Sequence, residues 1–197
     1  MSRMLKYLNG SLVEYQVFKL VDFYDPILRT PTELFQFSDE ESLKQASFLG
    51  YSMSETLQHL KGLGLSANQV GINKRLCVVN MGTQNWIMFN PKIVNKSDEL
   101  STLSEGCLSY PGLFVKVPRA KEVTVQFQAM NGQWVEQKVD GLTAVCVQHE
   151  LDHLDGIVYT DRVSPIKLEQ AKRKVKKTLK QMSRITVEDL KRMGLAP

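Results

Sequence analysis

The segment HELDH (149–153) constrains the fold more than any other part of this sequence. Its two histidines are four residues apart, and side chains at i and i+4 share one face of an α-helix. We therefore predict a helix over 143–156, with Asp140 as a possible N-cap and Gly156 at its end. Such a helix presents both imidazoles to one metal ion, while Glu150 can reach a water molecule without being a ligand.

An alternative interpretation is that these are two surface histidines in a charged stretch. The chain has only three histidines, however, and two of them are here. Leu142 and Cys146 fall on the same helical stripe as His149, which indicates that this stripe faces the interior. The opposite stripe is also apolar, with Val147, Leu151 and Leu154. A helix buried on two sides favours the metal site.

A catalytic metal site needs a third protein ligand and an open position. His59 lies in a predicted helix beside polar residues, and we interpret it as a partly exposed structural residue. Cys107 lies in STLSEGCLSYPG, a glycine-flanked loop or bulge between predicted strands, and a thiolate there is a suitable soft ligand. The pattern therefore favours Cys107 and leaves His59 as the alternative. Of the other two cysteines, Cys77 lies in a strand-like run and is expected in the core.

The remaining patterns predict an α+β domain, with a mainly antiparallel sheet around a central helix that carries the HExxH motif. A helix is expected over 40–61, with a capping box formed by Ser38 and Glu41. Strands are expected over 75–81, 85–94, 121–128 and 133–140, the last two joined by a hairpin at Asn131-Gly132. The domain is expected to span 16–182, between a leader of little pattern (1–15) and a C-terminal extension (183–197).

Charge and hydropathy narrow the cellular context. No apolar run approaches the roughly 20 residues of a membrane span. The N-terminus shows neither the apolar core nor the cleavage site of a secretory signal. We therefore expect a cytoplasmic protein without membrane contact. Residues 164–197 hold ten Lys and Arg against three Asp and Glu, within a net charge of +4. A basic helix is predicted over 166–182, either as a solvated face or as a contact for an anionic partner.

Three segments in this order resemble the signature motifs of peptide deformylases: GLGLSANQ (62–69), EGCLS (105–109) and QHELDH (148–153). Their combination is far more specific than any one motif, and the similarity extends from about residue 16 to about residue 180. The resemblance implies an enzyme that removes the formyl group from the N-terminal formyl-methionine of nascent polypeptides and releases formate. One position departs from the family, because Ser66 stands where alanine is common.

The resemblance also implies roles for individual residues. Cys107, His149 and His153 would hold one divalent ion, with Fe²⁺ expected in the cell and Zn²⁺ as the alternative. Glu150 would move protons, and the Gln69 side chain and the Leu108 backbone N–H would bind the former formyl oxygen. The methionine side chain and the peptide backbone are expected to contact Leu63, Gly64, Leu103, Leu142, Val145 and Cys146. Glu105 and Arg119 are expected to form an ion pair. If the basic helix is more than a solvated face, its expected partner is ribosomal RNA.

Two rival functions remain at this point. A zinc peptidase shares HExxH, although no downstream glutamate or histidine stands at the usual spacing. A non-catalytic protein with a structural metal is the second rival, but structural zinc sites usually have four protein ligands, and only three are found.

Overall fold

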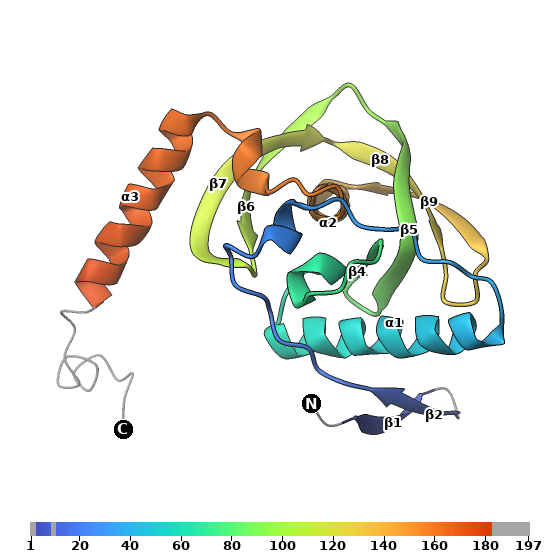
Figure 1. Cartoon of the computed structure of the whole chain (residues 1–197). Coiled ribbons are helices and arrows are strands. Elements are labelled where there is room, and N and C mark those ends of the chain that lie inside the picture. Colours follow the sequence, from blue (N-terminus) through green and yellow to red (C-terminus); the bar gives the residue numbers. More distant parts are fainter. Residues whose placement is uncertain (1–2, 9–10, 183–197) are drawn as a thin grey trace.

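The computed structural model describes residues 3–8 and 11–182, which form three antiparallel sheets and three α-helices (Figure 1). The strands are β1 (Met4–Leu8), β2 (Ser11–Tyr15), β3 (Gly64–Ser66), β4 (Leu76–Asn80), β5 (Asn85–Lys96), β6 (Leu100–Cys107), β7 (Tyr110–Ala120), β8 (Glu122–Gln128) and β9 (Trp134–Asp140). The helices are α1 (Glu40–Leu60), α2 (Gly141–Leu154) and α3 (Pro165–Met182), with 3-10 turns η1 (Pro26–Arg29), η2 (Ala67–Val70) and η3 (Tyr159–Arg162). The α+β class is confirmed, but the strands divide among three sheets.

The largest sheet has the order β3-β4-β5-β8-β9 and contains all four strands predicted from the sequence. Its strand β4 is covered on both faces, as a continuous apolar run predicts. Leu76 and Val78 pack toward α1, whereas Cys77 and Val79 pack in the cluster that contains α2. The expected hairpin between β8 and β9 is present, with Gly132 at a φ of +78°. Cys77 is fully buried, as predicted.

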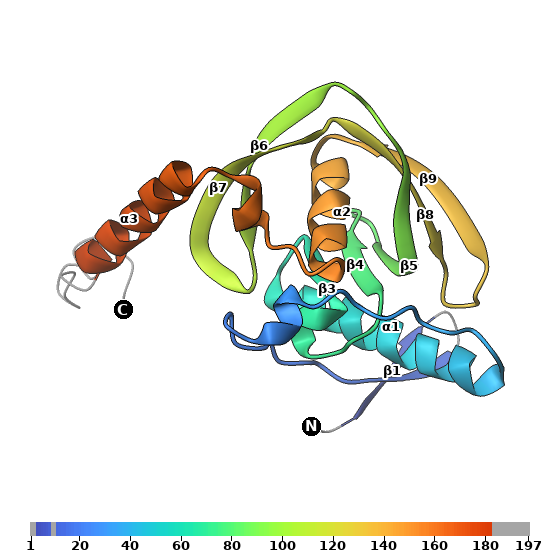
Figure 2. The ribbon, with the colours of Figure 1, turned by 45° about the horizontal axis from the view of Figure 1, so that its top comes forward.

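Helix α1 covers one face of this sheet (Figures 1 and 2). Its N-terminus is capped by Asp39 and Ser42, which exchange hydrogen bonds, so the capping box predicted at Ser38 and Glu41 was wrong by one residue. Gly50 permits close packing, because a Cβ atom there would come within 2.8 Å of the Met130 sulfur.

Helix α2 begins after the N-cap residue Asp140, as predicted, although the Asp140 side chain makes no capping hydrogen bond. The helix ends at Leu154, and Gly156 follows with a φ of +73°. A side chain at Gly156 would collide with the Arg29 carbonyl oxygen at 2.7 Å, so this turn requires glycine. The apolar stripe Val147, Leu151 and Leu154 is buried against the large sheet.

Strands β6 and β7 form a long hairpin that the sequence did not predict. Their residues include Pro111, Gly112 and Pro118, which are unfavourable in strand interiors. The pairing shifts register between Glu105 and Cys107, so the expected bulge at Cys107 is present. This hairpin forms a sheet separate from the larger one (Figure 2). Cys107 at its bulge lies against His153 of α2.

The N-terminal segment differs from the sequence prediction, whereas helix α3 agrees with it. Part of the predicted leader forms the hairpin β1–β2, which is joined to α1 by an ion pair between Lys6 and Glu55 at 2.8 Å. Helix α3 is present with Leu168, Ala171 and Val175 half-buried on one face. The expected extension 183–197 lies outside the described residues. Within the described part of the chain, no helix is long and apolar enough to cross a membrane.

Candidate active site

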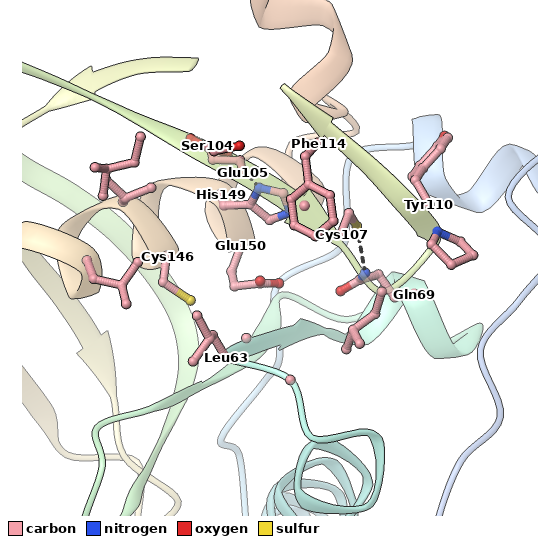
Figure 3. A pocket seen from close by; sticks show the side chains of 18 of the residues that line it. Leu63, Gln69, Ser104, Glu105, Cys107, Tyr110, Phe114, Cys146, His149 and Glu150 are labelled. Carbon is pink, nitrogen blue, oxygen red and sulfur yellow. Dashed lines mark hydrogen bonds and ion pairs between the residues drawn. The ribbon is translucent and has the colours of Figure 1, made fainter. Parts of the chain in front are cut away.

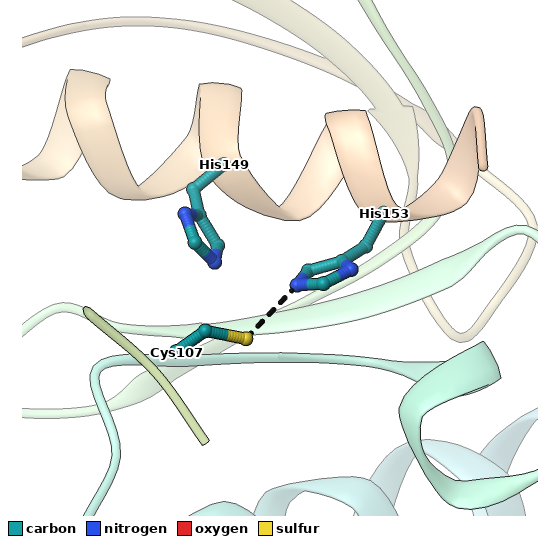
Figure 4. Close-up of side chains that lie close together, drawn as sticks. All are labelled: Cys107, His149 and His153. Carbon is teal, nitrogen blue, oxygen red and sulfur yellow. Dashed lines mark hydrogen bonds between the residues drawn. The ribbon is translucent and has the colours of Figure 1, made fainter. Parts of the chain in front are cut away.

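Three potential metal ligands meet between the β6–β7 hairpin and α2 (Figure 4). Each of Cys107, His149 and His153 offers one donor atom, and these atoms lie within 4.8 Å of one another. The Cys107 Sγ is 3.2 Å from the Nε2 of His153. Both histidines are buried, and Cys107 is half-buried at the wall of a cavity. The helical spacing and the bulge thus bring together the three predicted ligands, whereas His59 is exposed on α1.

Glu105 fixes the orientation of the His149 ring. Its Oε2 is 2.9 Å from the His149 Nδ1, which leaves the other ring nitrogen for a ligand. Arg119 donates to both oxygens of Glu105, at 2.8 and 2.9 Å. The expected ion pair between Glu105 and Arg119 is therefore present. Its contacts lower the pKa of Glu105 against the opposing effect of burial.

Arg119 also connects the hairpin to the middle of α2. It donates to Asp152, which lies inside the HExxH motif and is itself buried. Arg162, from η3, makes two further hydrogen bonds to the same carboxylate, at 3.0 and 2.5 Å. The Arg119 contacts thus join the β6–β7 hairpin to α2, and the Arg162 contacts join η3 to the same carboxylate of α2. The sequence reasoning missed both Asp152 and Arg162, although a charged residue within a helix predicted to be buried on two sides was a signal for Asp152.

The two histidines differ in their proton affinity. Burial and the charges of His149 and Arg119 lower the pKa of His153 to about 3, so this ring is neutral. Burial also lowers the pKa of His149, but hydrogen bonds to Cys107 and Glu105 outweigh it and raise the value to about 10 in the chain without a metal ion. The surroundings of His149 therefore favour a positive charge. A divalent cation suits this site, because the His153 imidazole is neutral, Cys107 offers a sulfur atom, and the surroundings of His149 favour positive charge.

Glu150 lines the same cavity as Cys107 and His149, and only 3% of its surface is exposed. Burial raises its pKa, while the charge of His149 and a hydrogen bond from Ser66 oppose the shift. A buried carboxylate with a raised pKa at a cavity wall is typical of a general base. Its position next to the potential ligand His149 is the one that the HExxH motif predicts.

Gln69, on η2, is held with its amide nitrogen toward the site. Its Oε1 accepts a hydrogen bond from the Ser66 backbone N–H at 2.8 Å, which fixes the amide orientation. Its Nε2 donates to the Ser109 hydroxyl at 3.0 Å and lies 3.4 Å from the Cys107 sulfur. Ser109 was not predicted as a site residue, although it belongs to the EGCLS segment.

A largely apolar cavity of about 490 Å³ opens next to Glu150 and His149 (Figure 3). All six residues expected to contact the substrate line it: Leu63, Gly64, Leu103, Leu142, Val145 and Cys146. Gln69, Cys107 and Leu108 line it as well. Leu142 is 55% exposed, so its helical stripe faces this cavity and not the closed core. The sequence reasoning missed Tyr110 and Phe114, which lie on the unpredicted strand β7.

Two imidazoles of one helix and a thiol from a bulged strand, next to a buried carboxylate and an apolar cavity, define the class of metal-dependent hydrolases. Comparison with known proteins narrows this class. The family model described as polypeptide deformylase matches residues 17–169. The chain belongs to this family, and its activity is that of a peptide deformylase.

Individual relatives agree with this assignment. A peptide deformylase of Thermotoga maritima is 37% identical over 151 residues, which cover 77% of this chain and 90% of that protein. The crystal structure of a peptide deformylase from Legionella pneumophila has a TM-score of 0.73 and 34% identity, and covers 85% of this chain and 98% of its own. The crystal structure of a peptide deformylase from Synechococcus elongatus, in complex with actinonin, has a TM-score of 0.71 and 36% identity. The match covers 80% of this chain and 85% of that one. The resemblance found in the three sequence segments is thus confirmed.

Proposed function

We propose that this chain hydrolyses the formyl amide at the N-terminal formyl-methionine of nascent polypeptides, releases formate, and does so at the site around Cys107, His149 and His153. The observation that supports this most directly is the convergence of these three donors within 4.8 Å, beside the buried Glu150. Helix α2 is, in this proposal, the central support of the site, since it carries both imidazoles and the carboxylate.

Cys107, His149 and His153 are proposed to hold one divalent ion. Bound there, the ion would act as a Lewis acid on the formyl group and on a water molecule. A thiolate with two imidazoles suits both Fe²⁺ and Zn²⁺. We propose Fe²⁺ in the cell, following the family, with Zn²⁺ as the alternative. If the ion is ferrous, loss of activity in air should be faster than without oxygen, and equal rates of loss would contradict this choice.

Glu150 is proposed to accept a proton from the attacking water and to pass it to the departing amine. Its burial supports this role, because a raised pKa brings the carboxylate closer to the proton affinity that such a transfer needs. The amine then leaves as the new N-terminus of the peptide.

Gln69 and Leu108 are proposed to stabilise the negative charge that develops on the former formyl oxygen. The Ser66 N–H donates to the Gln69 Oε1 and so directs the Nε2, the donor of the amide, toward the site. The Leu108 backbone follows directly after the ligand Cys107, in the turn of the β6–β7 hairpin. Donors that are fixed before the reaction act without a further cost of reorganisation.

The apolar cavity is proposed to take the methionine side chain, through Leu63, Leu103, Leu142, Val145 and Cys146. Gly64 has a different proposed role, because it begins the edge strand β3 of the large sheet. An extended peptide can add to an edge strand by backbone hydrogen bonds. This arrangement would place the formylated end of the peptide at Glu150, which lies against Gly64.

A direct test compares two substrates on protein purified without oxygen. A formyl-Met tripeptide should release formate, whereas an unformylated peptide with internal bonds should remain intact. Cleavage of internal bonds alone would establish the zinc peptidase instead, and no reaction with either substrate would favour a structural metal. Metal content, measured on the same sample, distinguishes an inactive chain from one that has lost its ion.

The basic helix α3 is proposed to contact ribosomal RNA, which would bring the enzyme to emerging peptides in the cytoplasm. Lys172 and Lys176 line a second cavity, of about 800 Å³, together with Phe23 and Tyr24. Both aromatic side chains are exposed, Tyr24 by 83%. Lysines beside exposed aromatic rings are typical of surfaces that bind RNA phosphates and stack on bases.

A further inference from the structure

Strand β3 contacts the Glu150 carboxylate through Ser66, the residue that departs from the family pattern. Ser66 is fully buried, and its Oγ is 2.7 Å from the Glu150 Oε2 and 2.9 Å from the Glu150 main-chain oxygen. The two residues are 84 positions apart in the chain. A serine at this position therefore reaches directly the group that is proposed to move protons.

The other carboxylate oxygen is confined by the same strand. A Cβ atom on Gly64 would be 2.3 Å from the Glu150 Oε1 and 2.8 Å from the Cys146 sulfur, so Oε1 lies in close contact with the glycine backbone. Gly64 also lines the substrate cavity. Strand β3 thus limits the rotation of the carboxylate at both oxygens, with Oε1 on the side of the cavity.

The hydroxyl of Ser66 has one hydrogen and two acceptors within reach. An ionised carboxylate is a stronger acceptor than a main-chain carbonyl, and the Oε2 is also the nearer of the two. An alanine at this position would supply no donor to either. The alternative is that the hydroxyl only satisfies the main-chain oxygen of α2, in which case it would contribute to stability alone.

We propose that Ser66 is a positioning residue for Glu150: its hydroxyl donates to Oε2 and holds the carboxylate with Oε1 toward the cavity. This inference rests on the proposed role of Glu150. It predicts that loss of the hydroxyl slows the proton transfer but leaves peptide binding unchanged, because the cavity walls do not include Ser66.

The first test is the steady-state kinetics of Ser66→Ala with a formyl-Met tripeptide. We expect kcat to fall by about three- to tenfold, the size of one hydrogen bond, with KM within about twofold. Ser52→Ala is the matched control, since Ser52 is also fully buried but accepts its hydrogen bond from the Gln16 backbone N–H, far along the chain from Glu150. An unchanged kcat in a folded Ser66→Ala variant, or an equal fall in the control, would overturn the inference.

The second test measures the same contact without using activity. A double-mutant cycle of Ser66→Ala and Glu150→Ala, followed by urea unfolding of the full chain, isolates the interaction between the two side chains. Ser66→Ala should reduce the equilibrium constant for folding by at least about threefold more when Glu150 is present than when it has been replaced. Equal effects in both backgrounds would overturn the inference. A wild-type chain that releases no formate would instead overturn the proposed function itself.

Discussion

Helices α2 and α3 are of similar length but differ in almost every property that matters for function. From Ala144 onward most side chains of α2 are buried, whereas residues 165–178 of α3 include only three half-buried positions. Two polar groups of α2 have charged partners in the protein, since Glu105 contacts His149 and Arg119 contacts Asp152, whereas the Nδ1 of His153 is buried without a hydrogen-bond partner among the described residues. In residues 165–178 of α3 the charged side chains are exposed, and Glu169 and Arg173 form a surface pair. A buried helix can therefore fix the geometry of reacting groups, while an exposed one can supply only charge.

The largest effect is expected from one chemical change made on both helices. Glu150→Gln removes the base while it preserves size, and should lower kcat by about 10²- to 10⁴-fold. Glu169→Gln on α3 makes the same change at an exposed position and should leave kcat unchanged. Formate release by both variants, with metal content measured in parallel, checks this. If Glu150→Gln retained more than a tenth of the wild-type rate, Glu150 would not be the base.

A second pair of variants tests the ion pairs that hold α2. Arg119→Met leaves the buried carboxylates of Glu105 and Asp152 without their shared cation, and should reduce the free energy of unfolding by about 3–5 kcal/mol. Arg173→Met removes an exposed i,i+4 pair on α3 and should change it by less than about 0.5 kcal/mol. Urea unfolding of both variants measures the difference. Similar losses in the two variants would contradict the distinction between the helices.

The third prediction concerns the pH dependence of metal binding by α2. Without an ion, His149 has a pKa of about 10 and holds a proton at neutral pH, whereas His153, at about 3, does not. Binding must displace the proton of His149, so affinity rises with pH, by at least about tenfold per unit between pH 6 and 8. Zn²⁺ competition against a coloured chelator measures this slope. Glu105→Gln should make this slope shallower, because one of the two hydrogen bonds that raise the pKa of His149 is lost. A slope of zero in the wild type would refute His149 as a metal ligand.

Sequence reasoning predicted α2 well because its evidence was local. Two patterns indicated the helix, the i, i+4 spacing of the histidines and the apolar stripes, and each can be recognised within one or two helical turns. Asp140 and Gly156 likewise marked the ends of the helix through neighbouring residues. The same applies to the hairpin at Asn131-Gly132, where the turn residues alone define the connection.

The rest of the site depends on contacts between distant segments, which no local pattern reveals. Strand β7 carries prolines and a glycine, yet it pairs with β6 along most of its length. Ser66 and Glu150 meet only after β3 packs against α2, so the hydroxyl was noticed as a departure from the family without an identified partner. The family resemblance strengthened the choice of Cys107 and supplied Gln69 and Leu108, because it summarises such contacts.

The smallest effect on the folded enzyme is expected from charge reversal on α3. Lys172→Glu with Lys176→Glu should leave kcat within about twofold and the free energy of unfolding within about 0.5 kcal/mol, because both residues are exposed. The same double variant should weaken co-sedimentation with ribosomes, and the loss should be greatest at low salt, where phosphate contacts are strongest. Lys44→Glu with Lys96→Glu changes the net charge equally at exposed positions elsewhere and should retain ribosome binding. If both double variants bound alike, the basic face of α3 would be an ordinary solvated surface, and of the two helices only α2 would have a function.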